Sequence, residues 1–257
     1  MRTLAIIAGL SAFAASSEAA TETVTALYDL RWEGLKVGEF RLDLDIDETT
    51  YAVRYQAEST GFVDTLADFR SQGSSQGFLR DGELEARAYR GMSQWRGGGS
   101  EWSVRFDADG QVDVIDIPED SIEDRGPVAD DLKVAPDPFA LALQTIFDVV
   151  PGAVIEGASF DGKRAVRYQL ECPDIGGNQA TSLDCRVIGR LVAGGSREWR
   201  ERTGDEPAAP EPVLLTFEQG IFEGHYWPVR VTTTSRFGEV AVELVDASSS
   251  SEIGQAG

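Results

Sequence analysis

The chain has 257 residues, of which 44 are acidic and 23 are basic, so its formal net charge is -21 at pH 7. A surface this acidic repels nucleic-acid phosphates and anionic lipid headgroups, because affinity for either depends on clustered lysine and arginine. The charge therefore argues against a nucleic-acid partner and favours a soluble protein with little tendency to self-associate.

Residues 1–19 have the composition of a secretory signal peptide. Arg2 is followed by the apolar run Leu4–Ala15 and then by small residues, the order that a signal peptidase recognises. The run is shorter than the roughly 20 residues of a membrane span. We expect cleavage after Ala19, with Ala14 as the second choice. Because no cysteine lies near the cut, the sequence predicts an exported protein that is not a lipoprotein and has no membrane span.

Alternating apolar and polar residues dominate the rest of the chain, which is typical of strands with one buried face. The first three runs, separated by turn residues, predict a meander. About a dozen such runs predict an all-β fold with a large antiparallel sheet curled into a barrel, half-barrel or sandwich, and we favour a barrel-like closure because a flat sheet would leave long exposed edges. The expected strands are 24–32, 40–46, 51–57, 84–95, 102–106, 112–117, 166–172, 185–192, 213–217, 226–237 and 240–245.

Two segments have a helical period instead. In the segment 137–150, Asp137 is a suitable N-cap, Pro138 suits the first helical position, and Pro151 ends the run. This short helix is expected to pack an apolar stripe on the sheet, or to plug or gate a barrel mouth. A shorter helical turn is expected within 62–69. The residues expected on the buried face of the longer helix are Phe139, Leu143, Ile146, Phe147 and Val150.

Both cysteines, Cys172 and Cys185, lie beside a glycine-rich loop at the end of one expected strand and the start of the next. Their spacing fits neither a zinc site nor a Cys-x-x-Cys redox pair. An oxidising compartment favours a structural disulfide between them. We therefore predict a bridge that closes a hairpin.

Further along the chain, the polar stretch 193–212 is rich in proline and glycine and predicts a mobile loop rather than a domain boundary. Residues 247–257 are expected to be a disordered tail. The sequence thus predicts a signal peptide over 1–19, a single β-rich domain over 20–246, and the tail.

No catalytic, metal or cofactor site is predicted. His225 is the only histidine; with no Gly-x-Ser-x-Gly motif for a nucleophile, it is interpreted as a solvated side chain at a strand edge. The phrase FDADGQVD lacks the closing glutamate of a calcium loop and is interpreted as a hairpin turn. Lys163 and Arg164 follow a tight Asp161-Gly162 turn after a strand ending at Phe160. They are interpreted as part of that turn, with an anion contact as the alternative.

Several phrases resemble an exported bacterial family, the domain of unknown function 3108. They are GLKVGEF, STGFVDTL, the Asp137-Pro138 helix start, SFDGKRAVRY, Cys185 and YWPVRVTTTSRFG, and they cover most of the chain. The resemblance implies a Gram-negative periplasmic protein with a barrel-like β fold. It brings no catalytic residues, and the 193–212 loop fits the family pattern poorly.

Three functions follow as hypotheses. The first is a non-catalytic periplasmic protein that supports the cell envelope through an unknown envelope protein or polymer. The second is a carrier that holds a lipid or another apolar small molecule in its interior under the helix. The third is an envelope hydrolase with paired carboxylates, for which the many acids single out no pair. The expected ligand-lining residues of the carrier are Tyr28, Phe40, Leu42, Tyr55 and Val229.

Overall fold

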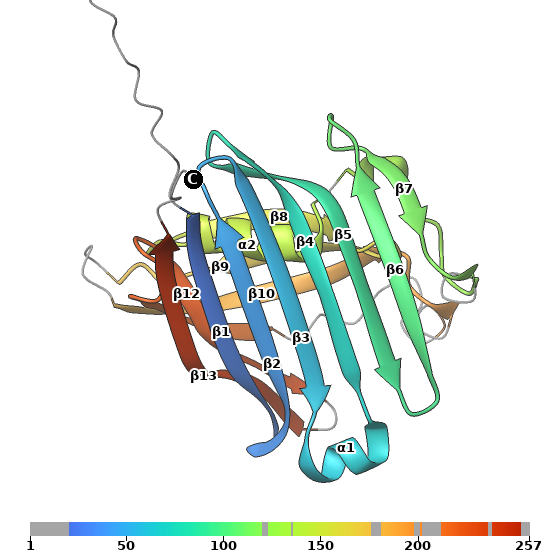
Figure 1. Cartoon of the computed structure of the whole chain (residues 1–257), viewed down its shortest axis with the longest axis horizontal. Helices are drawn as coiled ribbons and strands as arrows, with labels where there is room; N and C mark the ends of the chain where they lie inside the picture. Colours follow the sequence, from blue (N-terminus) through green and yellow to red (C-terminus); the bar gives the residue numbers. More distant parts are fainter. Residues whose placement is uncertain are drawn as a thin grey trace, which may run out of the picture.

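The computed structural model describes residues 21–119, 123–134, 136–175, 181–197, 201, 212–235 and 238–252. Strands joined by short turns make up most of it (Figure 1). The helices are α1 (Gly61–Ala67) and α2 (Pro138–Asp148), and a 3-10 turn spans Asp130–Leu132. The strands are β1 (Thr21–Trp32), β2 (Leu35–Ile46), β3 (Thr50–Ser59), β4 (Arg70–Arg80), β5 (Glu83–Trp95), β6 (Gly98–Phe106), β7 (Val112–Asp116), β8 (Val154–Phe160), β9 (Ala165–Glu171), β10 (Ser182–Ala193), β11 (Val213–Gln219), β12 (Tyr226–Ser235) and β13 (Gly238–Glu252).

All of these strands belong to one 13-stranded sheet in the order β7-β6-β5-β4-β3-β2-β1-β13-β12-β11-β10-β9-β8. Neighbouring strands are antiparallel, so the predicted all-β, curled sheet is confirmed. Apolar residues alternate inward as expected: Val24 lies opposite Leu44, and Leu44 lies opposite Val53, all three buried. The sheet brings β1 and β13 together at its centre, which joins the two ends of the described chain.

Among the described residues the sheet is curled but its edge strands β7 and β8 are not hydrogen-bonded to each other, so of the predicted forms the structure has the open one. Strand β7 has only 5 residues and Pro118 soon follows it, which leaves this edge few backbone groups for pairing. Side chains cover the opening instead. Phe160 at the end of β8 is buried in a cluster with Val112 of β7, Val128 and Leu132.

Helix α2 begins and packs as predicted. The Asp137 carboxylate accepts hydrogen bonds from the N–H groups of Phe139 and Ala140, which caps the helix. The helix contacts β4, β5, β8 and β12 and lies on the inner side of the curled sheet (Figure 1). The residues that it buries among the core side chains include Leu143 and Ile146. Val150, which was expected on this face, is exposed because the helix ends before it.

Strand β4 was not predicted, and its glycines explain why. Its inward positions include Gly73 and Gly77, so the run lacks the apolar alternation of its neighbours. Rings from β3 cover these positions. A Cβ atom added at Gly73 would lie 2.6 Å from Cε1 of Tyr55, and one at Gly77 would lie 2.8 Å from Cε1 of Tyr51. The neighbouring strand therefore supplies the apolar layer that β4 itself does not encode.

The disordered tail is a wrong prediction for residues 247–252. These residues form the end of β13 and pair with β1, from Ala247 opposite Ala26 to Glu252 opposite Thr21. Their side chains are mostly small and polar, but the ladder is made by backbone groups, so a serine-rich run can continue a strand whose partner is present. The expected signal peptide, residues 253–257 and most of the 193–212 loop lie outside the described residues.

The two cysteines form the predicted disulfide. Cys172 directly follows β9 and Cys185 lies in β10, so the bridge closes this hairpin. Both are buried in a second core cluster that includes Leu170 and Phe217. The covalent link therefore also holds together part of the apolar core.

Candidate functional site

The side chains expected to line a ligand cavity pack against one another instead. Ring centroids are 5.8 Å apart for Tyr28 and Phe40, 6.1 Å for Phe40 and Tyr55, and 4.6 Å for Tyr55 and Phe139 of α2. Leu42 is half-buried against the same core cluster, whereas Val229 is half-buried and outside it. A continuous series of aromatic rings thus occupies the space between the sheet and the helix.

The polar group of Tyr28 is satisfied inside the protein. Its hydroxyl donates to the Pro228 carbonyl at 3.0 Å and accepts from Nε1–H of Trp227 at 2.8 Å. Burial raises the pKa of Tyr28, so the phenol stays neutral. These hydrogen bonds orient the Tyr28 ring within the core and occupy its hydroxyl group as both donor and acceptor.

The side chains of Lys163 and Arg164 contact different partners within the protein and do not converge on one anion site. The Lys163 ammonium donates to the Ser100 hydroxyl at 3.2 Å and lies 5.1 Å from the ring centroid of Trp102. The Arg164 guanidinium pairs with Asp161 at 2.7 Å. The turn after β8 is thereby attached to β6 across the open side of the sheet.

His225 is not the solvated side chain that its position suggested. Its ring contacts two phenyl rings that also contact each other, with centroid distances of 4.9 Å to Phe147 of α2 and 4.8 Å to Phe222. Desolvation lowers the pKa of His225, because the charged form loses hydration in this contact. The histidine therefore packs against helix α2.

This packing predicts a pH dependence of stability. Because the folded pKa of His225 is below its ordinary value of 6.5, its contribution is fully present above pH 6.5 and is lost as the pH falls through the folded pKa. Urea midpoints should therefore fall between pH 7.5 and pH 5.5 by more in the wild type than in His225→Phe. Equal changes in the two proteins would contradict the assignment.

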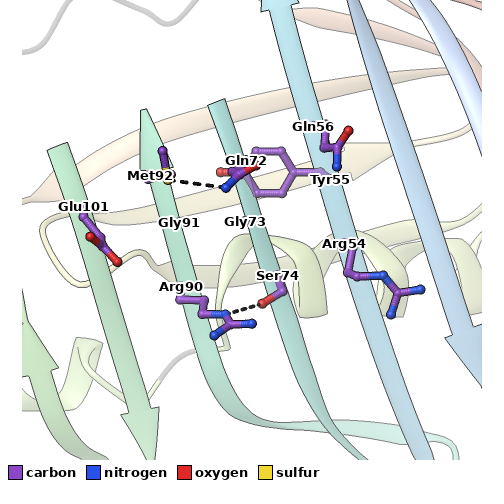
Figure 2. A pocket seen from close by; sticks show the side chains of 10 residues that line it. All are labelled: Arg54, Tyr55, Gln56, Gln72, Gly73, Ser74, Arg90, Gly91, Met92 and Glu101. Atoms are coloured by element: carbon purple, nitrogen blue, oxygen red, sulfur yellow. Dashed lines mark hydrogen bonds between the residues drawn. The ribbon is translucent and has the colours of Figure 1, made fainter. Parts of the chain in front are cut away.

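The outer face of strands β3–β6 carries a surface depression that is rich in polar side chains. Cross-strand register places Gln56, Gln72, Met92 and Glu101 in one row. An adjacent row contains Arg54, Ser74 and Arg90. The hollow between the rows has a volume of about 390 Å³, and its polar side chains project away from the core (Figure 2).

Short residues form the floor of this hollow. Gly73 and Gly91 contribute only backbone, and the ring of Tyr55 points to the opposite face (Figure 2). On the rim, Nε of Arg90 donates to the Ser74 hydroxyl at 3.1 Å. The depression therefore exists because the neighbouring strands β4 and β5 place glycine between the two rows of polar side chains.

A second hollow of about 420 Å³ continues the first across β2 and β1. The two share Gln56, Gln72 and Met92, and the second adds Arg41 and Arg70. We call this continuous strip the outer groove. Its boundaries follow cross-strand rows rather than any single strand, which is why the sequence alone did not indicate it.

The outer groove offers both hydrogen-bond donors and acceptors. Within the described ranges, the Gln56 amide and the Glu101 carboxylate make no side-chain hydrogen bond. The Arg54 guanidinium pairs with Asp45 at 2.7 Å, and the Gln72 amide is 3.4 Å from the Met92 sulfur. Amides can donate and accept at once, so this surface suits a ligand with many hydroxyl or amide groups.

The described ranges contain neither a group of three or more His, Cys, Asp or Glu side chains arranged for a metal ion nor a helix suited to cross a membrane.

Among the described residues, Glu101 is the only acid that lines the first hollow. In the second, Glu39 lies opposite Glu58, and Lys36 is 2.7 Å from Glu39. At FDADGQVD, the Asp107 carboxylate accepts N–H groups of the turn itself.

Comparison with known proteins supports the fold alone. No family model matches the chain, and no curated protein is significantly similar to it. A crystal structure of a beta-barrel-like protein with the domain of unknown function DUF1849, from Brucella abortus, aligns with a TM-score of 0.52 and 13% identity, covering 89% of this chain and 98% of that one. The resemblance to the domain of unknown function 3108 is not confirmed.

Proposed function

We propose that the protein is a non-catalytic periplasmic protein that supports the cell envelope by holding a hydroxyl- and amide-rich glycan strand in the outer groove. The observation that carries this proposal is the row of amide and guanidinium side chains on an open, shallow strip of the sheet. Export through the N-terminal segment would place this surface among the envelope polymers.

The chemistry of the groove supports a polymer over a small molecule. Small-molecule sites are usually concave and mostly apolar, whereas here Gln56, Gln72 and Arg90 surround a shallow, open depression. Sugar hydroxyls and acetamido groups donate and accept hydrogen bonds, as do the glutamine amides. The Met92 thioether can contact the apolar face of a sugar ring.

The other two hypotheses have less support. A carrier needs space among the inward side chains, but aromatic rings from β1, β2, β3 and α2 contact one another there. A hydrolase needs two carboxyl groups at catalytic distance. The first hollow offers Glu101 alone, and in the second Glu39, which lies opposite Glu58, is already paired with Lys36 at 2.7 Å. The open groove therefore favours binding without catalysis.

A binding measurement with matched variants tests the proposal. Gln56→Ala/Gln72→Ala removes two amides from the groove, and Gln76→Ala removes an exposed amide from the same strand outside it. We expect the double variant to bind isolated peptidoglycan, and a short soluble oligomer of N-acetylglucosamine, about thirtyfold more weakly, since two hydrogen bonds contribute roughly 2 kcal/mol. Gln76→Ala should bind as the wild type does.

Two results would overturn the proposal. One is that the wild type binds neither the polymer nor the oligomer. The other is that both variants bind with unchanged affinity, which would separate the interaction from the outer groove.

A further inference from the structure

One end of the curled sheet exposes an unusual number of large apolar side chains. Phe62 and Leu66 on α1 are 76% and 59% exposed, and Leu35 at the start of β2 is 70% exposed. Trp32 and Trp95, at the ends of β1 and β5, are 45% and 46% exposed. We call these five residues the apolar rim. Clusters of this kind on a soluble protein mark interaction sites more often than chance exposure does.

Contacts between the three connections bring these residues to one place. Trp32 lies opposite Leu35 in the β1–β2 register. The N–H of Thr60, just before α1, donates to the Val37 carbonyl, and the N–H of Arg96, after β5, donates to the Ala67 carbonyl at the end of α1. Figure 1 shows α1 at the same end of the sheet as the β1–β2 turn and the end of β5.

Helix α1 leaves its two largest apolar side chains, Phe62 and Leu66, largely out of its own packing. None of its residues is buried, and Phe62 and Leu66, four positions apart, lie on one face. The helix is held instead by backbone hydrogen bonds and by the Arg96 guanidinium, which donates to the Thr65 carbonyl. The exposed face is therefore available to another molecule without unfolding the helix.

Acidic side chains outnumber unpaired basic side chains around the apolar rim, so the net charge there is negative. Two of the nearby cations are already ion-paired: Lys36 contacts Asp29 at 2.7 Å, and Arg70 contacts Asp68 at 3.3 Å. The third, Arg96, donates to the Thr65 carbonyl of α1 and adds one positive charge. In contrast, within the described part of the chain no ion pair involves the Asp64 carboxylate on α1. The same holds for the two acids beside the β1–β2 and β12–β13 turns, Glu33 and Glu239.

We infer that the apolar rim docks a partner protein whose own apolar surface is bordered by lysine and arginine. Charge complementarity selects this partner. A second copy would place the same carboxylates against each other and add another -21 of charge, and an anionic bilayer would be repelled in the same way. The inference concerns a different surface from the outer groove and stands independently of glycan binding.

Two synthetic amphipathic helices of about 18 residues test the inference. Both carry the same leucine and phenylalanine stripe, which is bordered by lysine in one and by glutamate in the other. Fluorescence polarisation of the labelled peptides should show binding of the lysine-bordered peptide. Phe62→Ser/Leu66→Ser should weaken it about tenfold or more, because two apolar side chains lose their burial.

Control variants distinguish binding at the apolar rim from nonspecific binding to exposed apolar side chains elsewhere on the protein. Val154→Ser/Ile175→Ser removes two exposed apolar side chains outside the rim, on β8 and just after β9, and should leave the affinity unchanged. Asp64→Asn keeps an oxygen for the Ser59 hydroxyl but removes the charge, so it should reduce the preference for the lysine-bordered peptide. Higher salt should weaken binding in the wild type more than in Asp64→Asn.

Several outcomes would overturn the inference. Equal affinity for the lysine-bordered and the glutamate-bordered peptide would show that charge does not select the partner. Dimerisation in sedimentation experiments that Phe62→Ser/Leu66→Ser abolishes would identify a second copy as the occupant. Co-sedimentation with phosphatidylglycerol vesicles that the same variant abolishes would identify a bilayer.

Discussion

Asp137→Ala is expected to lower the melting temperature by on the order of 10 °C. The carboxylate is fully buried, caps α2, and accepts a hydrogen bond from the buried Ser75 hydroxyl at 2.8 Å. Alanine leaves two helix N–H groups and this hydroxyl without their acceptor inside the core. Loss of the cap and of these bonds costs about 3 kcal/mol, which corresponds to a shift of roughly 6–12 °C in a domain of this size.

Asp137→Asn is the matched control, and calorimetry can compare the three proteins. Asparagine is an equally good cap, so this variant should remain within about 1 kcal/mol of the wild type. Burial raises the pKa of Asp137 above its ordinary 3.8. The wild type should therefore lose stability relative to Asp137→Asn as the pH rises through the folded pKa. Similar melting of the Ala and Asn variants would show that the cap contributes little.

Cys172→Ala/Cys185→Ala is expected to destabilise the protein by roughly 3 kcal/mol, because the disulfide no longer restricts the β9–β10 loop in the unfolded chain. The bridge spans 13 positions in sequence and lies in the second core cluster. Urea unfolding should show a lower midpoint for the double variant than for the oxidised wild type. Reductant should lower the midpoint of the wild type but not that of the variant.

If the oxidised wild type and the double variant unfold at the same urea concentration, the bridge does not stabilise the hairpin. The comparison with reductant also distinguishes the covalent link from the loss of buried sulfur atoms. Only the wild type contains a bond that reductant can break, so a drop shared by both proteins would indicate a different cause.

The elements that the sequence predicted correctly depend on residues close together in the chain. Alternation identified most strands, and Asp137 and Pro138 marked the start of α2. The presence of just two cysteines, in a chain expected to carry a signal peptide, predicted their disulfide. In each case the physical cause is local: the side-chain period of a strand, the capping of free N–H groups, or the chemistry of a single pair of thiols.

The errors and omissions have a common cause in contacts between strands. Strand β4 does not show in the sequence pattern because its inward positions are glycines, which rings of Tyr51 and Tyr55 on β3 cover. Residues 247–252 read as a tail in the sequence, but backbone pairing with β1 orders them as a strand. The predicted environment of His225, a solvated strand edge, was wrong because Phe147 of α2, which packs against its ring, lies far from it in sequence. A sequence pattern cannot report a partner that only the folded chain brings near.

By itself, the sequence determined the fold class, the helix on the sheet and the disulfide, since each has a local physical signature. The tertiary structure alone decided that the sheet stays open, that aromatic rings occupy its interior, and that the outer groove and the apolar rim exist. Those features arise from the register of paired strands and from the meeting of three separate connections. Register depends on which backbones pair, so it places distant side chains in rows that no single stretch of sequence contains.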